Sequence, residues 1–309
     1  MRIVKDPSRI KFSGPIVALG NFDGVHLGHK KILEAAAKFA KKSRGTSIAL
    51  TFDPHPQQVV SPERGLRLLT TLEEREDLIS RLGIDELLVI RFDDALRKLS
   101  WDQFAKKYLV DRLRARMVFV GYDYAFGRGR GGGVSHLRDQ GKRYGFGVTV
   151  IKPVSLSGEI VKSKMIRELA SSSRFAEAVK LLGHPYIISG KVVRGEGRGR
   201  DLGFPTANLK VDKDKLVPSH GVYAGIAYVN GVPHKCVLNI GARPTFALDG
   251  TAVEVHIMHF TRRILGKTLK VEISHRLRDE RQFSDVSLLI GQIKKDVARA
   301  SRLVKIKLA

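Results

Sequence analysis

The densest group of chemistry-bearing residues lies early in the chain, in the segment Gly20–His29, which reads GNFDGVHLGH. An apolar run precedes it and a helix-like run follows it, so we expect a strand-to-helix turn. Such a turn presents backbone N–H groups and the positive end of a helix, which together bind phosphate. His26 and His29 are spaced to share one helical face, and Gly28 between them leaves the backbone open to a phosphate. Two donors there could stabilise the charge of a departing pyrophosphate.

The same two histidines have two other interpretations, a metal-ligand pair or a pair of surface side chains. A zinc site needs a third protein ligand, and His55 is the only nearby candidate. The sequence therefore favours phosphate binding at this turn.

A second glycine-rich segment, residues 190–208, reads GKVVRGEGRGRDLGFPTAN. Its alternating glycines and arginines predict a flexible basic loop that wraps a polyphosphate through backbone N–H groups and guanidinium forks. It lacks the Gly-Lys-Ser/Thr ending of a Walker A loop. An arginine- and glycine-rich RNA-binding segment is the alternative. Because the loop is short and changes abruptly into Phe204–Asn208, a folded site is favoured.

The elements that position the first segment alternate between apolar runs and amphipathic helix-like runs. This alternation predicts an α/β domain, a parallel sheet with helices on both faces, over residues 1–183. The predicted strands are 16–22, 47–52, 86–92, 117–122 and 148–154, and the predicted helices are 30–42, 101–114, 134–143, 163–170 and 175–182. Gly183 is expected to end the last of these helices.

Residues 184–309 show a different pattern, with apolar runs and no helices between them. The predicted strands are 186–193, 221–229, 232–240, 252–260 and 269–277. Asn230-Gly231 predicts a type I′ hairpin turn, which needs positive φ at both residues. We therefore expect an antiparallel sheet or small barrel, with an amphipathic helix over 285–304 that covers one end.

The charge balance is strongly basic, with 55 Lys and Arg against 31 Asp and Glu, or +24 in 309 residues. The excess is +13 over residues 1–183 and +11 over residues 184–309, so no basic tail exists. A solvated basic surface and a patch for anionic partners are both open interpretations. Aromatic residues make up only 7% of the chain and lie mostly inside apolar runs, so we expect no nucleic-acid partner.

Cysteine usage and the first residues bear on the compartment. The single cysteine, Cys236, lies in an apolar run, is expected in the core, and allows no internal disulfide. The start, MRIVKDPSRI, lacks the apolar stretch of a signal peptide, and no apolar run is long enough to span a membrane. We expect a cytoplasmic protein with no membrane partner, whose oligomeric state the sequence does not give.

Several segments, in order along the chain, resemble those of a known family. The first half resembles the FAD synthetase branch of the nucleotidyltransferases, and the second resembles riboflavin kinase, most specifically in GRxLGFPTAN. The matching segments are Gly20–His29, Thr51–Pro56, Val120–Gly132, Gly199–Asn208, Gly221–Gly225, Asn239–Phe246, Val253–His256 and Leu277–Phe283. The chain thus resembles the bifunctional riboflavin kinase/FAD synthetase family as far as about residue 304.

The resemblance implies an α/β Rossmann-like nucleotidyltransferase domain, residues 1–183, followed by a six-stranded antiparallel β-barrel with a C-terminal helix, residues 184–309. The first domain would transfer AMP from ATP to FMN, which gives FAD and releases pyrophosphate. The second would phosphorylate riboflavin to FMN with ATP and Mg²⁺. The small-molecule substrates would be riboflavin, FMN and ATP.

One segment departs from the family pattern and leaves an alternative open. Where the family carries a Ser/Thr-rich segment ending in Arg-Ile-Arg, residues 161–167 read VKSKMIR and keep only Ser163, Ile166 and Arg167. A riboflavin kinase with a degenerate adenylyltransferase domain is therefore a second hypothesis, and a basic RNA-binding protein is a remote third.

The resemblance also assigns residues of the first half to ATP, with Asn21, His26 and His29 as the catalytic ones. The remaining expected ATP contacts are Gly20, Phe22, Asp23, Gly24, Gly28, Asp123, Arg130, Ser163 and Arg167.

In the second half, oxygen-preferring Mg²⁺ suits the Thr206 hydroxyl and the Asn208 carbonyl. Glu254 lies among apolar strand neighbours, where partial desolvation would make it a better general base for the riboflavin hydroxyl. A surface glutamate is the alternative, since Glu272 also lies in a strand. The expected ATP contacts are Gly195, Gly197, Arg198, Gly199, Arg200, Gly203 and Pro205, and the expected flavin contacts are Asn239, Arg243, Arg278, Asp279, Arg281 and Phe283.

Overall fold

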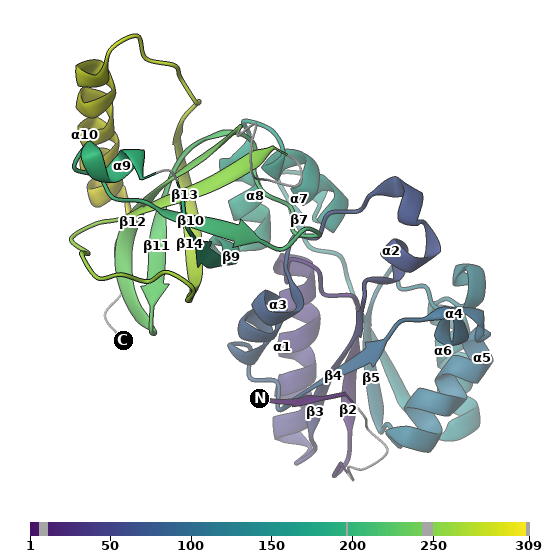
Figure 1. Cartoon of the computed structure of the whole chain (residues 1–309). Coiled ribbons are helices and arrows are strands. Elements are labelled where there is room, and N and C mark those ends of the chain that lie inside the picture. Colours follow the sequence, from purple (N-terminus) through teal and green to yellow (C-terminus); the bar gives the residue numbers. More distant parts are fainter. Residues whose placement is uncertain (6–11, 196, 243–249, 307–309) are drawn as a thin grey trace. The chain divides into compact units, whose positions relative to one another are not determined.

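The structure, a computed structural model, describes residues 1–5, 12–195, 197–242 and 250–306, and the chain divides into two units (Figure 1). The first comprises Met1–Leu68 and Leu72–Ser163, and the second comprises Leu69–Thr71 and Lys164–Ala309. The helical segment that follows Ser163 thus groups with the second unit.

Parallel strands form the sheet of the first unit, in the order β1-β4-β3-β2-β5-β6. The fully buried strand β2 (Ile16–Leu19) pairs with β3 (Ser47–Asp53) on one side and β5 (Met117–Gly121) on the other. The chain leaves β2 for β3 and β4 on one side and later fills β5 and β6 on the other. The carboxyl ends of β2 and β5 therefore form a topological switch point, where open α/β sheets bind ligands.

Helices cover both faces of this sheet, with α1 and α3 on one face and α5 and α6 on the other (Figure 1). The predicted helix 101–114 is α5 followed by the π-helix η3. Phe104 of α5 and Tyr108 and Leu109 of η3 pack against the sheet. The α-helices and other strands of this unit are β1 (Arg2–Val4), α1 (Leu27–Lys42), α2 (Pro56–Val60), α3 (Leu72–Ser80), β4 (Glu86–Arg91), α4 (Asp94–Lys98), α5 (Trp101–Phe104), α6 (Val134–Tyr144), β6 (Gly147–Ile151), β7 (Ser155–Leu156) and β8 (Glu159–Ile160). Single turns and the π-helix are η2 (Pro62–Arg64), η3 (Ala105–Arg112) and η4 (Arg128–Arg130).

Six antiparallel strands of the second unit close into a barrel in the order β10-β13-β12-β11-β14-β9. Its strands are β9 (Tyr186–Val193), β10 (Ala207–Val211), β11 (Gly221–Val229), β12 (Val232–Ala242), β13 (Thr251–Ile257) and β14 (Thr268–Arg278). Asn230 and Gly231 have φ of 49° and 81°, which confirms the predicted hairpin turn. The apolar pattern did not predict β10, because the strand is short and alternates with the polar Asn208 and Lys210.

The helices of the second unit are α7 (Ser163–Ala170), which begins at the last residue of the first unit, α8 (Phe175–Leu182), α9 (Arg198–Asp201) and α10 (Val286–Leu303). Gly183, at φ 74°, ends α8 as predicted. The C-terminal half of α10 packs Val297 and Ala300 against the barrel residues Val222 and Leu277. In the part of the chain that the structure describes, no helix has both the length and the apolar character needed to cross a bilayer.

A glycine inside the barrel gives a direct test of this packing. Gly225 lies on β11, and a Cβ there would overlap the Glu272 carbonyl of β14. Gly225→Ala is expected to lower the free energy of unfolding by about 1–3 kcal/mol, because backbone must move to admit the methyl group. Gly291 of α10 faces open space, so Gly291→Ala is expected to raise the free energy of unfolding by about 0.5–1 kcal/mol. Urea unfolding of both variants measures the difference, and equal stabilities would contradict the packing argument.

Candidate active sites

His26 lies directly before the first residue of α1 and caps that helix. Its Nδ1 accepts hydrogen bonds from the backbone N–H groups of Gly28, at 3.1 Å, and His29, at 3.4 Å. A ring nitrogen that accepts carries no proton, so the neutral ring is protonated at Nε2. The cap therefore fixes His26 as a neutral imidazole whose donor is Nε2–H.

The two histidine rings stack, with centroids 3.7 Å apart and planes at 19°. His29 lies in the first turn of α1, and Phe22 meets its ring edge-on at 5.4 Å. A Cβ at Gly28 would lie 3.1 Å from the His26 ring, so the space predicted for a phosphate at this glycine is next to that ring. The sequence placed both histidines on one helical face, whereas the structure brings them together as a cap and its stacking partner.

The backbone of the turn is tightly constrained. Phe22, Gly24 and Val25 have φ of 51°, 81° and 38°. Phe22 is fully buried, and a Cβ at Gly20 would lie 2.7 Å from its ring. Left-handed backbone at Phe22 and Val25 is costly for side chains with a Cβ, so surrounding contacts must hold this conformation.

Two side-chain hydrogen bonds supply such contacts. The Thr51 hydroxyl of β3 donates to the Asn21 carbonyl at 2.9 Å, and the Ser163 hydroxyl donates to the Asp23 carbonyl at 3.1 Å. Ser163, predicted as an ATP contact, thus holds the turn from outside. Arg167, also predicted as an ATP contact, lies further along α7 in the second unit.

His55 has a structural role. Its Nδ1 accepts from the Gln57 N–H at 3.1 Å and so caps α2. Among the described residues, no three His, Cys, Asp or Glu side chains are grouped to hold a metal ion.

The loop after β5 carries Asp123 and Arg130, both exposed, near the switch point of the sheet. Its glycines serve packing. A Cβ at Gly127 would lie 2.5 Å from the Trp101 backbone nitrogen, and a Cβ at Gly132 would overlap the Trp101 side chain. Close approach to Trp101 therefore accounts for these glycines, while the basic side chains remain at the surface.

Strand pairing in the barrel brings three predicted residues into one row. Glu254 of β13 lies directly opposite Asn208 of β10 and Asn239 of β12. Its neighbours Val253 and Val255 are buried inside the barrel. Side chains alternate along a strand, so the three polar groups share the outer face, with Cβ atoms of directly opposite residues about 4.5–5.5 Å apart.

The glycine-rich loop folds back onto this row. A Cβ at Gly195 would overlap the Asn208 amide, and a Cβ at Gly199 would lie 2.5 Å from the Phe204 carbonyl and 3.3 Å from the Thr206 hydroxyl. Gly197 and Gly203 have φ of 83° and 82°, which suits glycine. The backbone of the loop thus lies against the two residues predicted to hold Mg²⁺.

Three other predicted ATP contacts lie in this loop or directly after it. Arg198 begins α9, and Arg200 and Pro205 are exposed.

His256 is a residue of this face that the sequence reasoning did not assign to the site. Its Nδ1–H donates to the Pro205 carbonyl at 3.0 Å, and its ring meets Phe204 edge-on at 5.5 Å. Because it follows Glu254 by two residues on the same strand, the alternation of VEVHI could have identified it.

Arg278 anchors the C-terminal helix. Its Nε and Nη2 each lie 2.9 Å from Oδ2 of Asp296, and its Nη1 donates to the Asp279 carbonyl at 2.9 Å. Arg278 also lies over the half-buried Phe283 ring, 5.8 Å from its centroid. The predicted flavin contact is thus engaged in an ion pair that ties β14 to α10.

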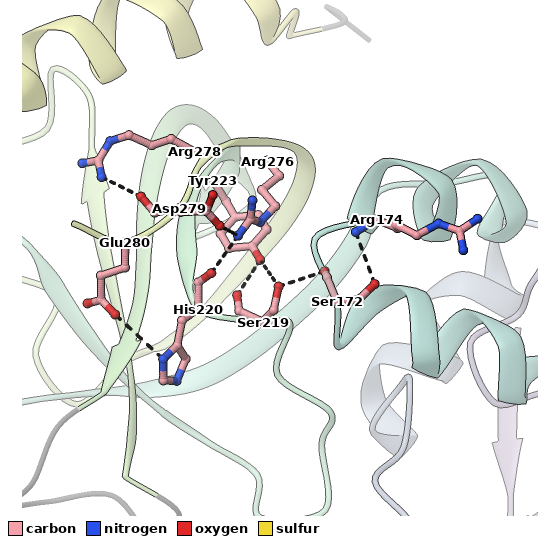
Figure 2. Close-up of polar contacts among 9 residues, drawn as sticks. All are labelled: Ser172, Arg174, Ser219, His220, Tyr223, Arg276, Arg278, Asp279 and Glu280. Atoms are coloured by element: carbon pink, nitrogen blue, oxygen red, sulfur yellow. Dashed lines mark hydrogen bonds and ion pairs between the residues drawn. The ribbon is translucent and has the colours of Figure 1, made fainter.

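Figure 2 shows the contacts that hold the loop after β14. Arg276 donates to the carboxylate of Asp279 and to the His220 carbonyl, and Glu280 lies 3.8 Å from His220 Nδ1. The hydrogen bond and charge of Arg276 lower the pKa of Asp279, so this carboxylate stays ionised to lower pH.

The same network reaches the connection between α7 and α8, because Ser219 accepts from Tyr223 and donates to the Ser172 carbonyl (Figure 2). Of the other predicted flavin contacts, Arg281 is exposed, and Arg243 lies outside the described residues.

The chain is similar to known families and proteins over both halves. Residues 9–165 match the FAD synthetase family, and residues 182–304 match the riboflavin kinase family. Three relatives are named bifunctional riboflavin kinase/FMN adenylyltransferase. They come from Listeria monocytogenes (37% identity, 91% of this chain and 90% of the relative), Bacillus subtilis (35%, 93% and 92%) and Escherichia coli strain K12 (33%, 96% and 95%).

A solved structure from Streptococcus pneumoniae, titled a macrolide-efflux protein, is similar with a TM-score of 0.84. It shares 28% identity and matches over 98% of this chain and 99% of that one. The likeness extends over both units.

The ion pair between Arg278 and Asp296 gives a stability prediction. Their side chains are 15% and 7% exposed, so Asp296→Ala leaves a largely buried guanidinium without its partner and is expected to cost about 3 kcal/mol. Asp296→Asn, which keeps an acceptor for Arg278, should cost less. Urea unfolding of the full chain measures both, and a loss for Asp296→Ala below about 0.5 kcal/mol, as at an ordinary surface site, would contradict the prediction.

Proposed function

Because the chain belongs to the bifunctional riboflavin kinase/FMN adenylyltransferase family, we propose that its two reactions take place at the two residue clusters described above. The chain phosphorylates riboflavin to FMN with ATP and adenylylates FMN to FAD, with release of pyrophosphate. Family membership favours this interpretation over a kinase with a degenerate first domain and over an RNA-binding protein.

For the kinase, the row Asn208–Glu254–Asn239 is the observation that carries the proposal. Glu254 takes the proton of the ribityl 5′-hydroxyl as that oxygen attacks the γ-phosphorus of ATP and the bond to ADP breaks. Asn208 and Asn239 flank the carboxylate and orient it. Loop backbone from Gly195 to Gly203, with Arg198 and Arg200, holds the phosphates.

The donor set fits Mg²⁺. The Thr206 hydroxyl and the Asn208 carbonyl are hard oxygen ligands beside a carboxylate, and they leave room in the coordination shell for waters and phosphate oxygens. When bound, Mg²⁺ would neutralise phosphate charge. His256 supports this arrangement, because its hydrogen bond to Pro205 holds the residue before Thr206.

On the flavin side, we propose that the loop Asp279–Phe283 and Asn239 contact the isoalloxazine or ribityl groups. Asp279 is the first residue of this loop. Arg276 donates to its carboxylate, and Arg278 donates to its carbonyl.

For the adenylyltransferase, the neutral His26 is the observation that carries the proposal. A phosphate oxygen of FMN attacks the α-phosphorus of ATP while the bond to pyrophosphate breaks. Nε2–H of His26, with His29 and Asn21, donates to the phosphate oxygens as negative charge spreads over them. Asp123 and Arg130, at the switch point, contact the nucleotide, with Ser163 in support.

We also propose that the reactions take place in the cytoplasm and that the functional boundary lies near Gly183. The only cysteine is Cys236. It is free and buried, and burial raises the pKa of its thiol, so it stays protonated and suits a reducing compartment.

Glu254→Gln tests the kinase assignment. Without a base, FMN formation from riboflavin and ATP is expected to fall at least about 100-fold, while FAD formation from supplied FMN is unchanged. Glu272→Gln is the matched control, because Glu272 lies on β14 and accepts from Tyr228 at 3.0 Å, away from the row. Separation of the flavins by chromatography measures both reactions. FMN formation by Glu254→Gln within about threefold of wild type would show that Glu254 is not the base.

His26→Asn tests the adenylyltransferase assignment. Asparagine also caps helices well, so the variant should fold with normal stability but lack Nε2–H, and FAD formation should fall about 100-fold. His26→Ala should lose a further measure of stability, about 1 kcal/mol, with the cap. Kinase activity of the same molecules is the internal control. If His26→Asn makes FAD at the wild-type rate, the imidazole acts only as a cap.

A further inference from the structure

Arg75 is a charged side chain that neither reaction has so far explained. It lies in α3, which the sequence did not predict, and is the largest of the fully buried side chains, at 0% exposure. Burying a charge costs free energy, and an apolar side chain of similar length would fill the same space without that cost. The presence of an arginine therefore requires a reason beyond packing.

The contacts of Arg75 lead to the phosphate-binding turn. Its Nη1 donates to the Thr51 hydroxyl at 3.1 Å and to the Phe52 carbonyl at 3.3 Å. The Thr51 hydroxyl donates in turn to the Asn21 carbonyl at 2.9 Å. A continuous chain of hydrogen bonds thus runs from α3 through β3 to the turn.

The charges near Arg75 point to the same place. Burial lowers the pKa of Arg75, while the negative charges of Asp23 and Asp53 act in the opposite direction. Asp23 is 1% exposed and belongs to the turn, and Asp53 ends β3. A carboxylate inside a turn that receives phosphates is unfavourable by itself, and a guanidinium that acts on it reduces that repulsion.

The guanidinium is also only partly bonded. Its Nε and Nη2 have no hydrogen-bond partner among the described residues. An arginine that served only to tie α3 to the sheet would be expected to use its whole planar fork. The open donors keep the positive charge available to the carboxylates around it.

We propose that Arg75 is a positioning residue for adenylyl transfer, which fixes the Asn21 carbonyl of the turn through Thr51. This inference rests on the proposed role of the turn in binding ATP phosphates. Arg75 touches no reacting atom. It holds donors in place before the phosphates arrive, and a displacement of about 1 Å at such a site can cost about 100-fold in rate.

Thr51→Val and Arg75→Met test the two links separately in the full-length protein. Thr51→Val removes only the hydroxyl, and Arg75→Met keeps the stem but removes the charge. Each is expected to lower kcat for FAD formation from FMN and ATP about tenfold or more, with KM for FMN unchanged. Arg75→Lys, which keeps the charge, should recover part of the loss.

Two controls separate positioning from stability. Riboflavin phosphorylation by the same molecules should stay at the wild-type rate. Thr149→Val is the matched substitution in β6 of the same sheet, where the hydroxyl donates to the Met117 sulfur at 3.7 Å, and it should keep both activities. If Arg75→Met fails to fold, Thr51→Val alone decides, and full FAD formation by that variant overturns the proposal.

The double variant gives the sharpest readout. If Arg75 acts through Thr51, adding Thr51→Val to Arg75→Met should lower kcat no further, whereas independent effects would multiply. Multiplied losses overturn the proposal. Normal FAD formation by His26→Asn would instead overturn the donor role of His26 in the proposed function, and a loss in His26→Asn without one in Thr51→Val would overturn the role of Arg75 alone.

Discussion

Hydrogen bonding between neighbouring strands is the constraint on which both sites depend. In the barrel, the register that pairs Glu254 with Asn208 and Asn239 is the same register that turns Val253 and Val255 inward. A slip of one residue would exchange the two faces of the strand and place a carboxylate in the apolar interior. The apolar core therefore enforces the position of the proposed base.

In the first unit, strand pairing constrains the backbone at the carboxyl ends of the strands. Parallel pairing places the carboxyl end of β2 beside that of β3, where the Gly20 N–H donates to the Leu50 carbonyl at 3.2 Å and the Thr51 hydroxyl reaches Asn21. These bonds hold a turn whose φ values at Phe22 and Val25 would otherwise be unfavourable. The N-cap of His26 then fixes the start of α1 directly after this turn.

Glycines illustrate how one composition serves two purposes. The glycine-rich segment 190–208 indicated a flexible phosphate loop, yet Gly195 and Gly199 are required by contact with Asn208 and Phe204. In the loop after β5, Gly127 and Gly132 are likewise required by contact with Trp101. The segments bring backbone close to side chains as well as to any ligand. A phosphate site needs a rigidly packed loop, because hydrogen-bond donors that are fixed in advance need not reorganise during the reaction.

Periodicity by itself predicted most of the strands, the parallel and antiparallel halves and the hairpin at Asn230-Gly231, because these depend on local spacing. The resemblance of short motifs to a family supplied most candidate residues. Tertiary structure decided the rest. It revealed β10, the row through Glu254, the contact of His256 with Pro205, the ion pair of Arg278 with Asp296, and the buried Arg75. Each of these joins residues far apart in the chain, and strand register and helix packing, which no local pattern encodes, bring them together.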